Sequence, residues 1–169
     1  TSATVASTNT PQSIYNQATS GNPVLSDPLN AQTSSNWSED SAASYSCAFT
    51  GGTYQIQEAQ NISVAFCFAQ ATNFSNFAFQ AQMTISQGDG GGLIFRDNNA
   101  EAYRFFVSSN GYYDLVVSPA RNGTGVTRLV SGTSATINTG LNQTNMLTVI
   151  ARNSMIYLYV NKQYVASVS

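Results

Sequence analysis

The sequence contains no histidine, and only 8% of its residues are charged. The absence of histidine excludes Ser-His-Asp and Cys-His catalytic arrangements and every zinc site that needs a histidine ligand. Charged residues normally account for about 25% of a globular protein, so uncharged Ser, Thr, Asn and Gln must cover most of the surface here. The net charge of −2 leaves no basic stripe for nucleic acid or anionic lipid. We therefore expect no nucleic-acid partner.

No apolar run approaches the about 20 residues of a membrane-spanning helix, so we expect no direct membrane insertion of this segment. The 169 residues fit one domain. The only two cysteines are Cys47 and Cys67. A disulfide between them would close a loop of about 20 residues and stabilise the fold by about 3 kcal/mol, whereas two buried thiols are the alternative. The hydroxyl-rich, uncharged surface favours an exported protein in an oxidising compartment, and hence the disulfide.

The first 21 residues are poor in apolar side chains and rich in Ser, Thr, Asn and Gln. Such a composition cannot bury enough surface to offset chain entropy. We interpret residues 1–21 as a stalk or linker, partly ordered against the domain, and residues 22–169 as the folded domain. A short helical turn over Pro11–Ala18 is the one helix candidate.

Short alternating runs separated by turn residues fill the chain from residue 22 onward, a pattern typical of an all-β sandwich. The clearest is Phe77–Ile85, in which every second residue is apolar and the residues between are mostly polar, as in a half-buried strand. Shorter candidates are Thr53–Gln57, Val64–Phe68 and Gly92–Arg96.

Strand parity predicts a hairpin between Tyr103–Val107 and Tyr113–Val117. The apolar residues of the two strands share a face only if the loop between them has an odd number of residues. The three residues that end at Gly111 provide such a loop. Arg104 and Asp114 would then be diagonal neighbours on the opposite face.

The last part of the chain predicts a three-stranded meander. Asn145–Arg152 and Met155–Val160 match across a two-residue turn, and a second such turn leads to a final strand. The second turn places Leu158 opposite Val165 and Tyr159 opposite Tyr164. One face of the meander is apolar, and the other carries three tyrosines that would pack beneath a loop or a further strand: Tyr157, Tyr159 and Tyr164.

A glycine run, QGDGGGLIFR over Gln87–Arg96, opens directly into one of these strands. Because glycine accepts positive φ, we expect a sharp bend here. Leu93 and Phe95, or else Ile94, should enter the core. The strand would deliver Arg96 to a sheet edge or face.

Seven short motifs follow one another in a characteristic order. They are DPLN…NWSE (27–39), GGTYQI (51–56), FSNFAFQAQMTI (74–85), GDGGGLIFR (88–96), AYRFFV (102–107), GYYDLVV (111–117) and NMLTVIARNSMIYLYVNKQYVASV (145–168). This order resembles the concanavalin A-like, laminin G-like jelly rolls, in particular the branch of 3-keto-disaccharide hydrolase-like domains. The resemblance implies an all-β, two-sheet antiparallel jelly-roll sandwich.

Domains with this combination also resemble the extracellular portions of bacterial membrane serine/threonine kinases. The resemblance implies a stalk to a membrane helix, a cell-surface location, and pairing of Cys47 with Cys67. Members usually continue past the position of Ser169 with a closing strand. We therefore expect either a shortened segment or an open sheet edge covered by N-terminal residues or a second chain, which would allow an oligomer.

Catalytic residues are not evident. Glucanases that share this sandwich carry two glutamates and an aspartate alternating along one strand, and no strand here has that spacing. Our leading hypothesis is a non-catalytic extracellular ligand-binding domain, with carbohydrate as the favoured ligand, or a sensor domain of a receptor-type kinase. The alternatives are a glycoside or 3-keto-disaccharide hydrolase, and a protein-interaction or adhesion module.

Binding candidates combine an aromatic platform with planar hydrogen-bonding groups, as sugar sites do. They are Arg96, Asp97, Asn99, Arg104, Tyr112 and Asp114. The alternative is structural: Arg104 and Asp114 form an exposed cross-strand pair worth under about 1 kcal/mol, and Arg96 pairs with Asp97 or a loop carbonyl.

No cofactor is required by this hypothesis, but a structural calcium ion is an option because related sandwiches often hold one. Asp27 and Asp89 are the candidate ligands, although calcium needs six to eight oxygens and no ligand string is visible. For Asp89 the alternative is a turn residue. Trp37 is expected to be a packing anchor rather than a stacking platform.

Overall fold

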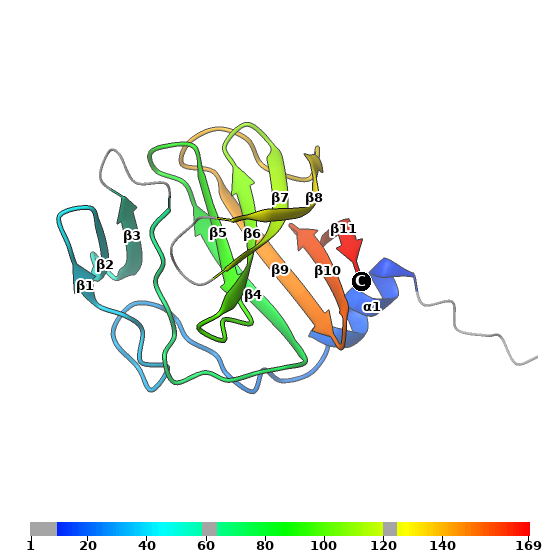
Figure 1. The fold of residues 1–169 in the computed structure, drawn as a ribbon, viewed down its shortest axis with the longest axis horizontal. Helices are drawn as coiled ribbons and strands as arrows, with labels where there is room; N and C mark the ends of the chain where they lie inside the picture. The colour runs from blue at the N-terminus through cyan, green and yellow to red at the C-terminus, as the bar shows by residue number, and fades with distance from the viewer. Residues whose placement is uncertain (1–9, 59–63, 120–124) are drawn as a thin grey trace, which may run out of the picture.

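The computed structural model describes residues 10–58, 64–119 and 125–169, which form one helix and eleven strands (Figure 1). The elements are α1 (Pro11–Thr19), β1 (Asp40–Ser41), β2 (Tyr45–Thr50), β3 (Thr53–Glu58), β4 (Phe77–Thr84), β5 (Gly90–Phe95), β6 (Glu101–Ser108), β7 (Tyr112–Pro119), β8 (Thr127–Thr133), β9 (Thr144–Arg152), β10 (Met155–Val160) and β11 (Gln163–Val168).

Eight strands form two four-stranded antiparallel sheets around one apolar core (Figure 1). Sheet I has the order β11-β10-β9-β4, and sheet II has the order β5-β6-β7-β8. Both sheets contribute side chains with no solvent exposure, including Phe105, Val107, Leu115, Leu147, Val149, Leu158 and Val160. The predicted all-β, two-sheet antiparallel sandwich is confirmed. The strands follow two meanders, β5 to β8 and β9 to β11, with β4 beside β9, and the finer jelly-roll assignment stays a prediction.

The observed registers confirm the predicted hairpins. Across the β6–β7 loop Val107 lies opposite Tyr113, and Gly111 has a φ of 88°, in the left-handed region that this loop requires. Across the β9–β10 turn Leu147 lies opposite Val160, as expected.

One of the two residue pairs predicted between β10 and β11 is observed. Tyr159 lies opposite Tyr164, but Leu158 lies opposite Ala166 rather than Val165. The cause is a β-bulge at Leu158/Tyr159, where the extra residue of β11 is accommodated without a partner. A simple two-residue count cannot reveal such an insertion.

The glycine run acts differently from the prediction. Only Gly88 has a positive φ, of 82°, and the other three glycines are the first residues of β5. A Cβ atom at Gly92 would lie 1.9 Å from a backbone oxygen of β6, so close approach of two strands, not bending, requires that glycine. Leu93 and Phe95 enter the core, whereas Ile94 does not.

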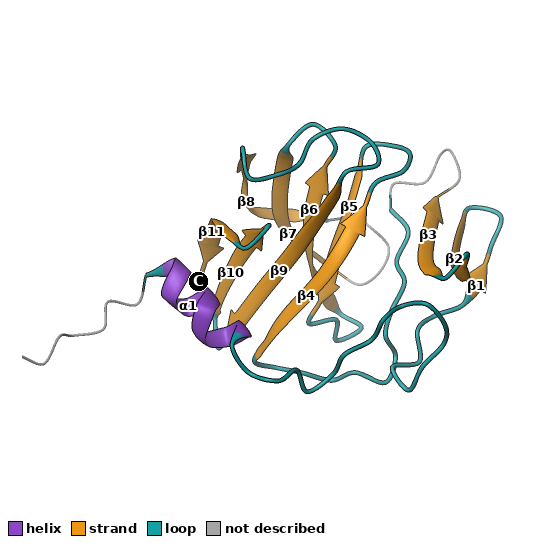
Figure 2. Cartoon of the chain, turned by 180° about the vertical axis from the view of Figure 1, so that it is seen from behind, coloured by secondary structure: helices purple, strands orange, loops and turns teal. Residues whose placement is uncertain are grey.

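The predicted helical turn is confirmed as α1, which packs on the outer face of sheet I (Figure 2). Thr10 caps the helix by accepting a hydrogen bond from the Ser13 backbone N–H at 3.2 Å. Tyr15 is buried against Tyr159, with ring centroids 5.0 Å apart, and the Tyr159 hydroxyl donates to the Pro11 carbonyl at 2.6 Å. A nine-residue helix is marginal alone in water, so this docking stabilises it.

Part of the predicted stalk is therefore ordered against the domain, while residues 1–9 lie outside the described residues. The docked helix accounts for two of the three tyrosines on the outer face of sheet I, since Tyr159 and Tyr157 both pack in the cluster formed with Ile14 and Tyr15. The described residues contain no helix with the length and hydropathy of a membrane span.

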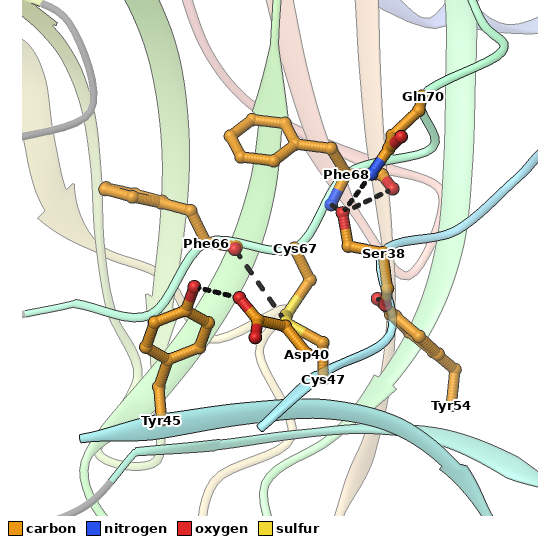
Figure 3. Close-up of a disulfide and its surroundings, with 9 residues drawn as sticks. All are labelled: Ser38, Asp40, Tyr45, Cys47, Tyr54, Phe66, Cys67, Phe68 and Gln70. Carbon is orange, nitrogen blue, oxygen red and sulfur yellow. Dashed lines mark hydrogen bonds between the residues drawn. A yellow bond between two sulfur atoms is a disulfide. The ribbon is translucent and has the colours of Figure 1, made fainter. Parts of the chain in front are cut away.

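Strands β1, β2 and β3 form a separate small sheet to one side of the sandwich (Figure 1). The predicted disulfide is confirmed: Cys47 of β2 is bonded to Cys67, with the Cα atoms 6.0 Å apart (Figure 3). Trp37 packs on Tyr54 of β3 at 5.0 Å between ring centroids, so it is a packing anchor of this small sheet.

The predicted strand over Val64–Phe68 is wrong, because these residues form no ladder. The segment is held at its end instead, where the Ser38 N–H donates to the Phe68 carbonyl at 2.8 Å and the Phe68 N–H donates to the Ser38 hydroxyl at 3.2 Å (Figure 3). An isolated bridge between Trp37 and Ala69 follows. The continuous apolar run contacts two different neighbours, Cys47 through the disulfide and Arg104 through the Phe66 ring, and does not belong to a sheet.

Candidate functional site

The structure separates the predicted binding residues into two groups. Arg96, Asp97 and Asn99 lie in or directly before the turn between β5 and β6, whereas Arg104 belongs to β6 and Tyr112 and Asp114 to β7. Arg96 bonds to Ser75 and Asn153, whereas Tyr112 and Asp114 bond to each other and to Arg128. The two groups therefore require separate interpretations.

The second group is a packing network on the outer face of sheet II. The Asp114 carboxylate accepts from the Tyr112 hydroxyl at 3.2 Å and from Arg128 Nε at 3.2 Å. The expected Arg104–Asp114 pair is thus replaced by an Arg128–Asp114 ion pair, since the adjacent strand β8 supplies a cation that hairpin parity did not include.

Arg104 lies over the ring of Phe66, with its guanidinium carbon 5.5 Å from the ring centroid. Burial lowers the pKa of Arg104, and the Asp114 carboxylate opposes that shift. A cation above an aromatic ring contributes about 0.5–1 kcal/mol at an exposed site and more when desolvated. Arg104 therefore helps to hold the disulfide-linked segment against the sandwich.

Arg96 and Asp97 of the first group border an open depression of about 550 Å³ at one end of the sandwich, whereas Asn99 does not line it. Three chain segments meet there: the residues that lead into β4, the β5–β6 turn and the β9–β10 turn. The lining residues are Asn73, Phe74, Ser75, Asn76, Arg96, Asp97, Asn98 and Asn153. We call this feature the asparagine depression.

Arg96 fixes the relative positions of these three segments. Its guanidinium donates to the Ser75 carbonyl at 3.0 Å and to the Asn153 carbonyl at 2.7 Å. The Asn153 N–H in turn donates to the Asn76 side-chain oxygen at 2.7 Å. Arg96 has a φ of 50°, a conformation that costs a non-glycine residue about 1–2 kcal/mol and that its two bonds offset. The two observed hydrogen bonds match the structural alternative expected from the sequence, in which Arg96 pairs with a loop carbonyl.

The depression offers amide groups beside an exposed aromatic ring. Phe74 is 46% exposed, and Asn73 has no side-chain hydrogen bond to another described residue. The Asn98 side-chain oxygen accepts from the N–H groups of Ala100 and Glu101 at 2.9 and 2.8 Å, which leaves its amide nitrogen as a donor at the rim. Small-molecule sites usually combine an apolar surface with a small number of polar groups that converge on it.

Most of these residues were not identified from the sequence. Of the eight residues that line the depression, Arg96 and Asp97 had been predicted as site residues. The signal that was present is asparagine in turns near three different strands, but turn asparagines are common because they tolerate positive φ. Their convergence depends on the packing of sheet I against sheet II.

The calcium prediction is not tested by the geometry, although Asp27 has other partners. Its carboxylate accepts from the Leu29 N–H at 3.0 Å, from Trp37 Nε1 at 3.1 Å and from the Thr33 hydroxyl. Burial alone would raise the pKa of Asp27, but these hydrogen bonds outweigh burial and lower the pKa. Within the described ranges no three acidic, cysteine or histidine side chains cluster as metal ligands. Asp89 is exposed in a turn, and its backbone oxygen accepts from the Ser109 N–H at 2.8 Å.

Comparison with known proteins gives limited similarity. No protein-family model and no curated protein matches the sequence. Among solved structures, the carbohydrate-binding module CBM66 from Bacillus subtilis is similar, with a TM-score of 0.46 and 19% sequence identity. The match covers 56% of this chain and 58% of that module, so this chain spans less than two thirds of the module. The sandwich assignment rests on the two sheets themselves.

Proposed function

We propose that this chain is a non-catalytic, extracellular carbohydrate-binding domain and that the asparagine depression is its binding surface. The observation that carries the proposal is the convergence of four asparagines, one arginine and the exposed Phe74 ring on one open depression. Amides bind sugar hydroxyls as donors and acceptors, and an aromatic face packs against the apolar C–H face of a sugar ring.

Preorganisation supports the proposal. Arg96 and Asn76 tie the three segments together before any ligand arrives. A rigid site loses less conformational entropy on binding than a set of mobile loops.

The acidic residues support binding rather than hydrolysis. The usual glycosidases need two carboxyl groups on either side of the scissile bond. Among the described residues that line the depression, Asp97 is the one acidic residue.

The cell-surface setting belongs to the same proposal. The Cys47–Cys67 disulfide supports an oxidising compartment. A role as the sensor domain of a receptor-type serine/threonine kinase, tethered through a stalk, comes from the sequence resemblance and is the finer form of the proposal.

A glycan array followed by calorimetry with the best binder tests the proposal. We expect Phe74→Ala and Asn73→Ala each to weaken binding by at least about tenfold, equivalent to about 1.4 kcal/mol. Both side chains line the depression, and Phe74 is exposed, so neither change should unfold the protein.

Leu129→Ala is the matched control, because Leu129 is a 39% exposed apolar residue on β8 that does not line the depression. Its affinity should equal that of the unmodified protein. An array without any binder, or equal losses in Phe74→Ala and Leu129→Ala, would contradict the proposal.

A further inference from the structure

A second depression adjoins the first. It has a volume of about 230 Å³ and lies on the outer face of sheet I beside the end of α1. Its lining residues are Ala18, Asn76, Phe77, Ala78, Ile150 and Arg152. We propose that the two depressions are adjoining subsites of one groove that binds a linear oligosaccharide rather than a single sugar unit. This inference rests on the proposed carbohydrate function.

Continuity between the depressions is provided by two elements. Asn76 lines both, and the β9–β10 connection places Arg152 in the second depression and Asn153 in the first. The Asn76 side-chain oxygen is held by the Asn153 N–H at 2.7 Å, which directs its amide nitrogen as a fixed donor at the junction. A chain that occupies both depressions therefore passes a preorganised hydrogen-bond donor.

The size of the second depression defines its role. Ligand pockets usually measure about 300–1,000 Å³, a range that includes the first depression but not the second, at about 230 Å³. The second depression is too small to select a ligand alone, but it can take the third unit of a chain whose first two units are seated in the larger first depression. Occupancy of both adds contacts without a second loss of translational freedom, so affinity rises with chain length.

The chemistry of the second depression also suits a sugar unit. The exposed Ala78 provides the apolar surface, since Ile150 is fully buried, and the exposed Arg152 provides hydrogen-bond donors at the rim. The Arg152 guanidinium is positioned by a 3.3 Å hydrogen bond to the Gln17 side-chain oxygen of α1.

Helix α1 is thus one wall of the groove, through Ala18. The contacts of Tyr15 with Tyr159 and of Tyr159 with Pro11 hold that wall in place. A segment with the composition of a stalk becomes part of the binding site.

Isothermal titration calorimetry with length series tests the inference. The probes are linear dimers, tetramers and hexamers from α-glucan, β-glucan, xylan, mannan and fructan, added to the full chain. We expect affinity to rise at least about tenfold from dimer to hexamer for the series that binds, equivalent to about 1.4 kcal/mol.

Two variants remove the second subsite. Ala78→Trp fills the depression from an exposed position of β4, and Arg152→Ala removes the rim donors from an exposed position of β9. Both should retain dimer affinity and lose the gain with length. Gln82→Trp is the control, because Gln82 is exposed on the same face of β4 and lines neither depression. It should keep the full gain.

The outcomes separate this inference from the proposed function. If dimer and hexamer bind equally, or if Ala78→Trp and Arg152→Ala keep the gain with length, the two-subsite groove is wrong while carbohydrate binding stands. If the unmodified chain binds none of the probes and none of the array glycans, the proposed function fails, and this inference fails with it.

Discussion

Replacing Arg96 separates two opposing contributions to the stability of the protein: the hydrogen bonds of its guanidinium and the strain of its backbone. The guanidinium donates two hydrogen bonds to loop carbonyls, and the backbone is held at a φ of 50°. Both bonds are solvent-exposed, so we assign each about 0.5–1 kcal/mol, the lower part of the range for such bonds. Arg96→Ala therefore loses about 1–2 kcal/mol and keeps the left-handed backbone.

Arg96→Gly loses the same bonds but removes the cost of positive φ, about 1–2 kcal/mol. It should therefore be more stable than Arg96→Ala, by up to about 1 kcal/mol after the extra chain entropy of glycine is counted. For a domain of this size 1 kcal/mol corresponds to about 2–4 °C in Tm. Arg96→Ala should unfold about 2–8 °C below the unmodified protein, with Arg96→Gly between the two.

Thermal and urea unfolding followed by far-UV circular dichroism measure the three proteins under the same conditions. Equal stability of Arg96→Ala and the unmodified protein would show that the two carbonyl contacts contribute nothing. A glycine variant less stable than the alanine variant would refute the assigned backbone strain. Reduced glycan affinity in both variants, despite intact folding, is expected because the three segments lose their connection.

Three further predictions concern stability. The double replacement Cys47→Ser/Cys67→Ser opens a loop with a sequence separation of 20 and should cost about 3 kcal/mol, or about 6–12 °C in Tm, in thermal unfolding; an unchanged Tm would show that the bond stabilises nothing. Burial raises the pKa of Tyr159 from 10.0 to about 12, so its contribution to stability is complete below pH 10 and is lost as the pH rises towards 12. Urea unfolding from pH 8 to 12 should show a smaller alkaline loss in Tyr159→Phe, and parallel curves would contradict the assignment. Gly92→Ala should cost about 3 kcal/mol, the upper end for overpacking, because its Cβ would lie 1.9 Å from a backbone oxygen. Gly91→Ala is the control, since its Cβ meets only a flexible methionine sulfur at 3.0 Å. Its Tm should stay close to that of the unmodified protein, and equal losses in the two variants would contradict the prediction.

Local features were predictable where short-range sequence rules control them. The hairpin loop ending at Gly111 and the β9–β10 turn follow from parity, because side chains alternate strictly along a strand. Where a bulge adds a residue, as in β11 opposite Leu158, the same rule fails. The Val64–Phe68 segment is apolar at every position but joins no sheet, since an apolar run predicts packing contacts and not the presence of a neighbouring strand.

The candidate site was predicted only in part, for a related reason. Arg96 stood out because it follows a glycine-rich strand, but its role as a connector of Ser75 and Asn153 depends on residues 21 and 57 positions away. The asparagines of the depression are individually ordinary turn residues. Nothing local distinguishes them from other turn asparagines in the chain.

By itself, then, the sequence determined the all-β class, the hairpins and the cysteine pair, and the lack of histidine excluded whole classes of catalysis. These follow from residue type and from periodicity over a few positions. Only the tertiary structure decided that α1 docks on Tyr159 and that three distant turns meet around Arg96. The reason is physical: burial of the two sheet faces against each other fixes which strand ends lie together, and that packing is a property of the whole chain.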